Sequence, residues 1–302
     1  MGVKKPAPSS PRGRRPPKTP LKTLERVLSK AGLGSRTEAR KWIGSGRVRV
    51  NGKLIQTPDH WVDLARDQVT LDDQPVKARD QIYLLLYKPT GYITAYKDPE
   101  GRPTVYDLIA DAGRWVVPVG RLDQDSSGLL LLTSDTRFAE RITNPDYKIP
   151  KTYLVKASTL LTDEQLQQLR DGVVLNDGPT QSAHVKRVRD SAKYSFIEIT
   201  LREGRNRQVR RMINAIGSKV LKLVRIEIGG LRIGDLPIGH YRELTSAELT
   251  MLGVGSSQTG STRNAELRPA RSKSRLSRDR VLQSSSRKSR RRRSKSHLPS
   301  VD

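Results

Sequence analysis

The residues with the clearest capacity for chemistry lie in the stretch from Val119 to Asp135, which has the sequence VGRLDQDSSGLLLLTSD. Asp123 lies there between a Gly-Arg-Leu turn and a strongly apolar run, with no histidine or cysteine beside it. Further along the chain, REGRNRQVRR places five arginines around a predicted strand-to-helix junction. Arginine forks and helix N-termini bind carboxylates and phosphates. An arginine from this junction that pairs with Asp123 would keep the carboxylate ionised in a half-buried site.

Simpler structural roles also account for these residues. Most lone aspartates are turn or capping residues, so Asp125 could bond to the turn that follows it and Asp135 could cap the helix TRFAERI. The arginine cluster could be a solvated basic surface. These residues alone therefore leave Asp123 as one aspartate that could be functional, and they go no further.

Familiar sets of catalytic and metal-binding residues are absent from the sequence. The chain has no cysteine, which excludes disulfides, thiolate metal sites and a thiol nucleophile. No phosphate-binding or dinucleotide-binding glycine loop occurs between a predicted strand and a predicted helix. The four histidines, which have no metal-ligand spacing, are His60, His184, His240 and His297. The sequence therefore predicts no metal and no cofactor.

The charge of the chain indicates a polyanionic partner, above all nucleic acid. The formal net charge is +26 and the pI is about 10.6. Residues 1–20 hold six Lys/Arg and no acid, and residues 255–302 hold fourteen against three acids, which leaves +9 for residues 21–254. Both ends, 1–20 and 254–302, are predicted to be disordered basic tails that bind RNA without sequence preference.

With no membrane-length apolar run and no secretory signal, we expect a cytoplasmic monomer without a membrane partner.

The first structured unit is predicted over residues 21–80. An apolar i, i+3, i+4, i+7 stripe from Leu24 to Ala31 predicts a short helix, and Ser35 begins a capping box for a second helix. Asn51-Gly52 within GRVRVNGKLI is a hairpin signal. The cations of this unit form either a solvated face or an RNA-binding platform, and the scarcity of acids favours the platform. They are Arg36, Arg40, Lys41, Arg47, Arg49 and Lys53.

The larger unit is predicted over residues 81–253. Its apolar segments QIYLLLYKP, WVVPVG and GLLLLTS predict buried strands, and YSFIEITL alternates as a half-buried strand does. TDEQLQQLRDG and RQVRRMINAIG have the spacing of amphipathic helices, and Thr162 is expected to be the N-cap of the first. These elements predict an α+β domain around a mostly antiparallel sheet.

Several of these segments resemble known families. GSRTEARKWIGSGRVRVNG resembles the alpha-L RNA-binding domain named after small-subunit ribosomal protein four, and GRLDQDSSGLLLLTSD resembles the signature of pseudouridine synthases. LLYKPTGYITAYKDPEGRPTVYDLI, KTYLVKA and the closing LREGRNRQVRRMINAIG resemble, in order, further motifs of the ribosomal RNA subfamily that carries an alpha-L domain. The resemblance spans residues 21–244. It is closest to the large-subunit enzymes, although the small-subunit enzymes share every motif.

The resemblance implies an α+β, mostly antiparallel mixed-sheet catalytic domain preceded by a small alpha-L domain. It also implies isomerisation of uridine in ribosomal RNA or a pre-ribosomal particle, without a cofactor. That reaction breaks the glycosidic bond, rotates the uracil and rejoins it through carbon five. One carboxylate suffices, by covalent attack or by removal of a sugar proton. A non-catalytic RNA-binding or ribosome-assembly factor on the same scaffold remains the alternative.

The resemblance also implies roles for individual residues. Asp123 takes the position of the catalytic aspartate, and Tyr153 that of the tyrosine on which the flipped base stacks. Arg210 takes the position of the arginine that ion-pairs with the aspartate, and Arg121 would shape the same loop and help to position RNA. The other arginines expected to contact RNA are Arg205 and Arg207.

Overall fold

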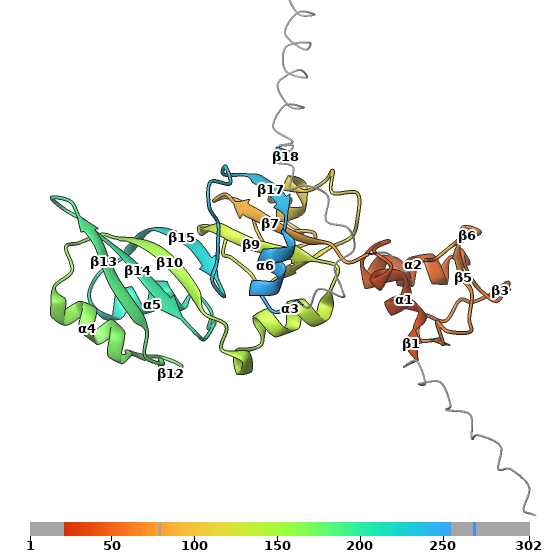
Figure 1. Ribbon diagram of the computed structural model, residues 1–302, viewed down its shortest axis with the longest axis horizontal. Helices are drawn as coiled ribbons and strands as arrows, with labels where there is room; N and C mark the ends of the chain where they lie inside the picture. Colours follow the sequence, from red (N-terminus) through yellow and green to blue (C-terminus); the bar gives the residue numbers. More distant parts are fainter. Residues whose placement is uncertain (1–20, 78–79, 255–267, 270–302) are drawn as a thin grey trace, which may run out of the picture. The chain divides into compact units, whose positions relative to one another are not determined.

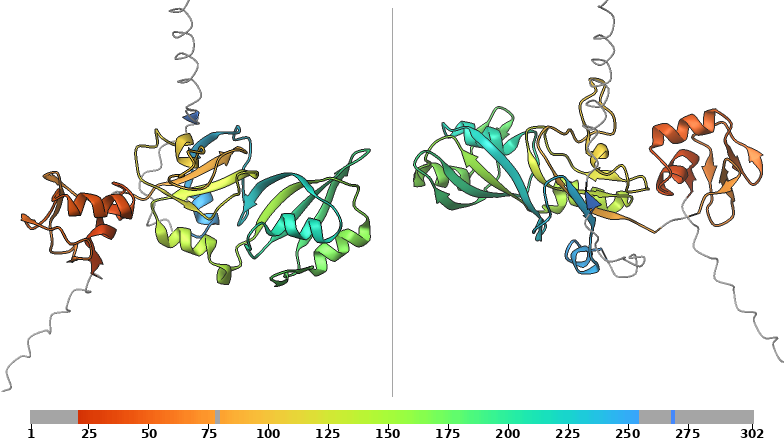
Figure 2. Two further views of the ribbon diagram at one scale, coloured as in Figure 1. Left: turned by 180° about the vertical axis from the view of Figure 1, so that it is seen from behind. Right: turned by 90° about the horizontal axis from the view of Figure 1, so that it is seen from above.

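The computed structural model of the protein describes residues 21–77, 80–254 and 268–269 (Figure 1). The chain folds as two compact units that divide between Arg79 and Asp80, and Figure 2 shows their elements from two further directions. The tails expected at 1–20 and 254–302 lie outside the described residues, except for Val254 and the short strand β18 (Arg268–Pro269). No helix in the described ranges is long and apolar enough to cross a membrane.

The first unit combines two helices with short strands. The helices are α1 (Leu24–Lys30) and α2 (Arg36–Gly44). The strands are β1 (Lys22–Thr23), β2 (Val48–Val50), β3 (Lys53–Leu54), β4 (Trp61–Val62), β5 (Val69–Leu71) and β6 (Gln74–Pro75). Four of them form a sheet in the order β3-β2-β5-β6, and β1 pairs with β4. The predicted capping box between Ser35 and Glu38 is present, as is the hairpin turn at Asn51-Gly52, where both residues have positive φ.

The second unit is built on one large sheet. Its strands are β7 (Tyr83–Lys88), β8 (Val117–Val119), β9 (Ser127–Thr133), β10 (Lys151–Ala157), β13 (His184–Asp190), β14 (Ser195–Leu201), β15 (Val220–Ile228), β16 (Leu231–Arg232), β17 (His240–Glu243) and β18. The strand order is β13-β14-β10-β15-β9-β7-β17-β18, with β8 beside β9 and β16 beside β15. In the described part of this sheet β9 and β15 run parallel, and the other strand pairs are antiparallel. The predicted α+β class with a mostly antiparallel mixed sheet is confirmed.

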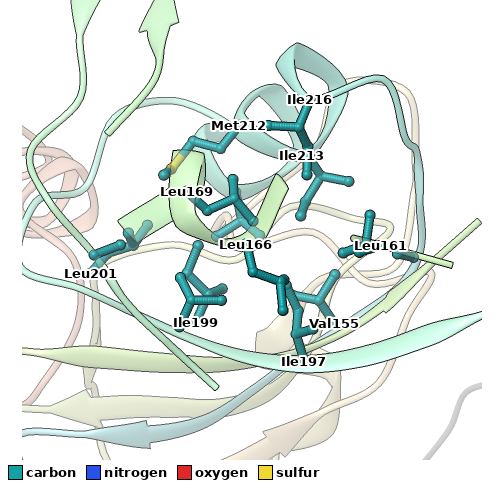
Figure 3. Close-up of a cluster of buried hydrophobic side chains, with 14 of the residues drawn as sticks. Val155, Leu161, Leu166, Leu169, Ile197, Ile199, Leu201, Met212, Ile213 and Ile216 are labelled. Carbon is teal, nitrogen blue, oxygen red and sulfur yellow. The ribbon is translucent and has the colours of Figure 1, made fainter. Parts of the chain in front are cut away.

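Helices cover parts of this sheet. They are α3 (Thr136–Thr143), α4 (Asp163–Asp171), α5 (Gln208–Ala215) and α6 (Ser246–Met251), together with two short 3-10 helices, η1 (Val105–Leu108) and η2 (Pro145–Tyr147). A hairpin of β11 (Val174–Leu175) and β12 (Gly178–Pro179) follows α4. Figure 3 shows the apolar cluster that fills the space between α4, α5 and the strands β10 and β14. The predicted caps Asp135 and Thr162 begin α3 and α4.

The central strands β7 and β9 are buried on both faces. Leu85 and Leu131 belong to one apolar cluster, and Leu84 and Leu130 belong to another on the opposite face. Two-sided burial explains why the two strands appear in the sequence as continuous apolar runs rather than as alternating patterns. It also fixes both strands firmly at the centre of the sheet.

Gly128 lies where β9 pairs with β15, the contact that joins β13, β14, β10 and β15 to the rest of the sheet. It faces Arg225 in the parallel pair of β9 and β15, and its φ of +111° is one that residues with side chains rarely adopt. A Cβ atom at this position would lie 2.2 Å from the carbonyl oxygen of Arg225. The backbones can therefore approach only because residue 128 has no side chain.

We predict that Gly128→Ala lowers the free energy of unfolding by about 3 kcal/mol or more, because it adds both backbone strain and a clash. Urea unfolding measures this change. Gly204→Ala is the matched control, since a Cβ there meets no atom within 4 Å and no left-handed φ is present. Its effect should stay within about 0.5 kcal/mol. Equal stability of the two variants would contradict the role of Gly128.

Candidate active site

The loop that carries Asp123 runs from Gly120 to Ser126 and joins β8 to β9. Gly120 has φ +77° and turns the chain as it leaves β8. The Ser126 amide donates a hydrogen bond to the Asp123 carbonyl at 3.1 Å, which closes the loop on itself. The Asp123 side chain is 35% exposed. It lines a cleft of about 310 Å³, so this carboxylate is accessible to a ligand.

The same cleft collects most of the site residues that the sequence predicted. Tyr153 of β10 lines it, as do Arg121, Arg205 and Arg207. The Tyr153 ring is half-buried and packs against two apolar clusters, which restricts its orientation. A half-buried aromatic ring beside an exposed carboxylate can receive a planar group next to a reactive one.

A buried lysine lies beneath the loop. Lys88, the last residue of β7, is 0% exposed, and its Nζ donates to the carbonyl oxygens of Pro89, Asp123 and Ser126 at 3.1, 2.9 and 2.8 Å. Burial lowers the pKa of Lys88 to about 8, although the charges of Asp123 and Asp125 act in the opposite direction. One ammonium group thus holds both ends of the turn that contains Asp123. Lys88 is not among the site residues predicted from the sequence, because a lysine that ends an apolar strand looks like a boundary residue.

The segment after β7 supports the other side of the loop. The Gly91 amide donates to the Gln124 carbonyl at 2.8 Å. The Thr94 hydroxyl donates to the Leu122 carbonyl at 2.8 Å and accepts from the Leu122 amide at 3.2 Å. The backbone on each side of Asp123 is therefore fixed by hydrogen bonds, while its carboxylate faces the cleft.

Two arginines at the start of α5 reach the loop. Arg207, the N-cap residue, has φ +46°, a left-handed conformation that is uncommon for residues other than glycine. Its Nη1 lies 3.4 Å from Asp123 Oδ2, and it donates to both carboxylate oxygens of Asp125 at 3.1 and 3.0 Å. Arg210 Nη2 donates to the Asp125 carbonyl at 3.0 Å and lies 3.2 Å from the Asp125 carboxylate. Its Nη1 donates to the Val220 carbonyl at 3.3 Å.

This arrangement corrects the expected ion pair. Arg207, and not Arg210, is the arginine next to the carboxylate of Asp123, while Arg210 pairs with Asp125. The left-handed backbone at Arg207 directs its side chain to the loop before α5 begins, a conformation that the sequence does not reveal. Asp125 is also more than a turn residue, since both arginines bind it. Burial alone would raise the pKa of Asp125, but the hydrogen bond from Arg207 and the charge of Arg210 hold it below its usual value.

Comparison with known proteins identifies the family of the chain. The RNA pseudouridylate synthase family matches residues 82–215, and the S4 domain family matches residues 23–69. An uncharacterized RNA pseudouridine synthase of Aquifex aeolicus is 40% identical over 76% of this chain and 92% of its own length. The chain belongs to the RNA pseudouridine synthase family.

Two further relatives extend the comparison. The ribosomal large subunit pseudouridine synthase B of Bacillus subtilis is 41% identical to this synthase, over 77% of the present chain and 96% of its own. A solved structure described as a pseudouridylate synthase superimposes with a TM-score of 0.55 at 30% identity. That superposition covers 76% of the present chain and 99% of the other.

Arg205 has a structural task in the synthase. Its guanidinium donates to the carbonyl oxygens of Gly178 and Pro179 at 3.0 and 2.6 Å, and its Nε donates to Glu203 at 3.2 Å. These bonds attach the β11–β12 hairpin to the wall of the cleft, so the expected RNA contact of Arg205 stays a prediction. Arg121 differs, because it is exposed and forms no ion pair or hydrogen bond with the described residues.

Two expected RNA-binding arginines of the first unit share a buried acid. Glu25 on α1 is 1% exposed and accepts hydrogen bonds from Arg36 and Arg40 on α2. The hydrogen bond from Arg40, and then the one from Arg36, hold the pKa of Glu25 below its usual value despite burial. Both arginines therefore hold the two helices together, while about half of each side chain stays exposed.

The remaining expected cations of this unit divide into two kinds. Arg47 Nε lies 2.8 Å from Asp72, and Arg49 Nε lies 3.4 Å from Asp73. The cations without an ion pair among the described residues are Lys41 and Lys53. RNA binding by the whole set stays a prediction, and these two lysines are its best-placed members.

We predict that Lys88 makes stability depend on pH above neutrality. Because its folded pKa lies below the usual 10.5, the unfolded chain binds more protons between pH 8 and 10.5, and stability rises with pH through that window. Between pH 7 and 9.5 the rise should be about 2 kcal/mol. Urea unfolding at both pH values gives this rise in the free energy of unfolding for the wild type and for Lys88→Met. The difference between the two rises is the contribution of Lys88. Parallel pH curves for the two proteins would contradict the assigned pKa.

Proposed function

We propose that the synthase isomerises uridines of large-subunit ribosomal RNA to pseudouridine, with Asp123 as its catalytic carboxylate. The observation that supports this assignment is the meeting in one cleft of the Asp123 carboxylate, the Tyr153 ring and the Arg207 guanidinium. The choice of RNA rests on relatives that are named as large-subunit enzymes, such as the one in Bacillus subtilis.

The reaction balances without an oxidant or a reductant. The bond between ribose C1′ and uracil N1 breaks, the base rotates, and a bond from C1′ to C5 forms. The proton that leaves C5 is matched by one that N1 gains. An ionised carboxylate starts the sequence either by covalent attack or by removal of a sugar proton. Either role needs a carboxylate that is open to the cleft, as that of Asp123 is.

The neighbours of Asp123 have separate tasks in this proposal. The uridine must leave its stack to reach the cleft, and the Tyr153 ring offers it a fixed aromatic face. Arg207 supplies a positive charge 3.4 Å from the carboxylate. Arg210 is 16% exposed and bonds to the backbone of Asp125, so it positions the loop rather than the substrate.

The proposal includes a setting for the reaction. The synthase acts in the cytoplasm as a monomer, on ribosomal RNA or a pre-ribosomal particle. The cysteine-free sequence and the +9 net charge of residues 21–254 support a reducing compartment and a polyanionic substrate. The S4 domain at residues 23–69 supplies a second basic unit for that substrate.

The decisive experiment maps pseudouridines in large-subunit ribosomal RNA after deletion of the gene. Wild type should restore the lost site and Asp123→Asn should not, because the amide keeps the size of the side chain but has no charge. Asp146→Asn should restore it, since that exposed carboxylate forms no ion pair within the described residues. An unchanged map after deletion would overturn the choice of RNA. Restoration by Asp123→Asn would overturn the catalytic assignment.

We predict different effects for Arg207 and Arg210, the two arginines that reach the Asp123 loop. Arg207→Ala removes an exposed ion pair, so the free energy of unfolding should change by less than about 1 kcal/mol. Its single-turnover rate should fall about tenfold or more, as the charge next to Asp123 is lost. Arg210→Ala should lower the free energy of unfolding by about 1–3 kcal/mol, because it leaves backbone carbonyls without donors. A larger loss of stability for Arg207→Ala than for Arg210→Ala would contradict these roles.

A further inference from the structure

The sheet of the second unit has a side that α4 and α5 do not cover. Along β10, Val155 and Ala157 belong to the apolar cluster beneath these helices, so Leu154 and Lys156 lie on the other side. Figure 3 shows Val155 and Ile197 directed from the strands into that cluster. We call the opposite side the reverse face. The residues that matter on it are Lys156, Lys186, Arg189, Phe196, Glu198 and Lys222.

One row of the reverse face places an aromatic ring among three cations. Strand register places Arg189 beside Phe196, Phe196 beside Lys156, and Lys156 beside Lys222, across β13, β14, β10 and β15. Arg189 Cζ lies 3.9 Å from the centre of the Phe196 ring. Lys156 Nζ lies 5.8 Å from the same ring and 4.1 Å from that of Tyr194. Both rings are partly exposed, so one surface offers aromatic faces and positive charge together.

The cations of this row have no carboxylate partners in the described part of the chain. Arg189, Lys156 and Lys222 form no ion pair there, and neither does Lys186 in the next row, where it lies beside Glu198. Lys156 and Lys222 are directly opposite each other, and like charges in that position destabilise a strand pair. A bound polyanion would remove this repulsion.

We propose that the reverse face binds a single-stranded segment of RNA outside the catalytic cleft. Bases would lie against Phe196 and Tyr194, and phosphates would lie near Lys156, Arg189 and Lys222. Sheets that present aromatic rings among basic side chains bind unpaired RNA in this way, because every base has a face that can stack. Double-stranded RNA or an acidic protein would contact the cations but would not stack on the rings.

The reverse face is separate from the cleft. Tyr153, which lines the cleft, packs in the apolar cluster on the α4 and α5 side of β10, whereas Lys156 lies on the opposite side of that strand. An RNA segment bound there is therefore a second contact, which strengthens the binding of longer RNA. The inference rests on the proposed function only in taking RNA as the substrate. Its test measures binding without turnover, so it can fail while the pseudouridine map stands.

The first arm of the test removes charge. Binding of the full chain to a short single-stranded oligouridylate is measured over a range of salt concentrations. Lys156→Gln/Arg189→Gln should flatten the slope of log affinity against log salt by about 1.4, at roughly 0.7 for each phosphate contact. Lys77→Gln/Arg137→Gln removes one exposed lysine and one exposed arginine elsewhere and should leave the slope unchanged. Equal effects of the two double variants would overturn the proposal.

The second arm removes the rings. Tyr194→Leu/Phe196→Leu should weaken oligouridylate binding about tenfold or more at fixed salt, because base stacking is lost. Its binding to a blunt RNA duplex should not change. Phe196→Tyr keeps the ring and should bind as wild type does, which separates stacking from a packing defect. No loss of oligouridylate affinity, or an equal loss for the duplex, would show an anion-binding surface without base contacts and overturn the proposal.

Discussion

The geometry of the Asp123 loop depends on one buried ammonium group. Lys88 Nζ donates to three backbone carbonyls, two of which belong to the turn from Asp123 to Ser126. A buried cation is costly unless its donors are satisfied, and here all three are. Because β7 and β9 are covered on both faces, Lys88 cannot move away from the loop. The centre of the sheet thus fixes the backbone that presents Asp123.

The cleft forms only where two distant segments meet. The loop before β9 supplies two carboxylates, and the start of α5 supplies two arginines that follow them by more than eighty residues. The parallel pair of β9 and β15 brings these segments together, and Gly128 permits the close approach of its backbones. Asp125 pairs with both arginines, and Asp123 keeps one longer contact, to Arg207. A weakly paired carboxylate in a cleft is suited to react.

The sequence predicted what depends on local pattern. Caps at Ser35, Asp135 and Thr162 and the turn at Asn51-Gly52 follow from a few neighbouring residues, and the structure confirms them. The α+β class follows from apolar runs and periodicity. Strand order did not follow, because the partners are far apart in the chain. The predicted ion pair of Arg210 with Asp123 was wrong, because the left-handed backbone of Arg207 brings that arginine to Asp123 instead. Lys88 was missed because its three acceptors are backbone atoms, which no side-chain motif reveals.

The strand that carries Tyr153 shows how one alternating pattern serves two surfaces. In KTYLVKA, every second side chain faces α4 and α5, and the residues between them must face elsewhere. An ordinary solvated face mixes charges of both signs. One row of the reverse face instead holds Arg189, Lys156 and Lys222 together, while Glu198 lies in the neighbouring row. The two rings contact cations rather than the apolar core. Such a row is unfavourable by itself and becomes favourable beside a polyanion with planar bases. An RNA-modifying enzyme always has such a partner, so the pattern that builds the cleft also leaves a surface for the rest of its substrate.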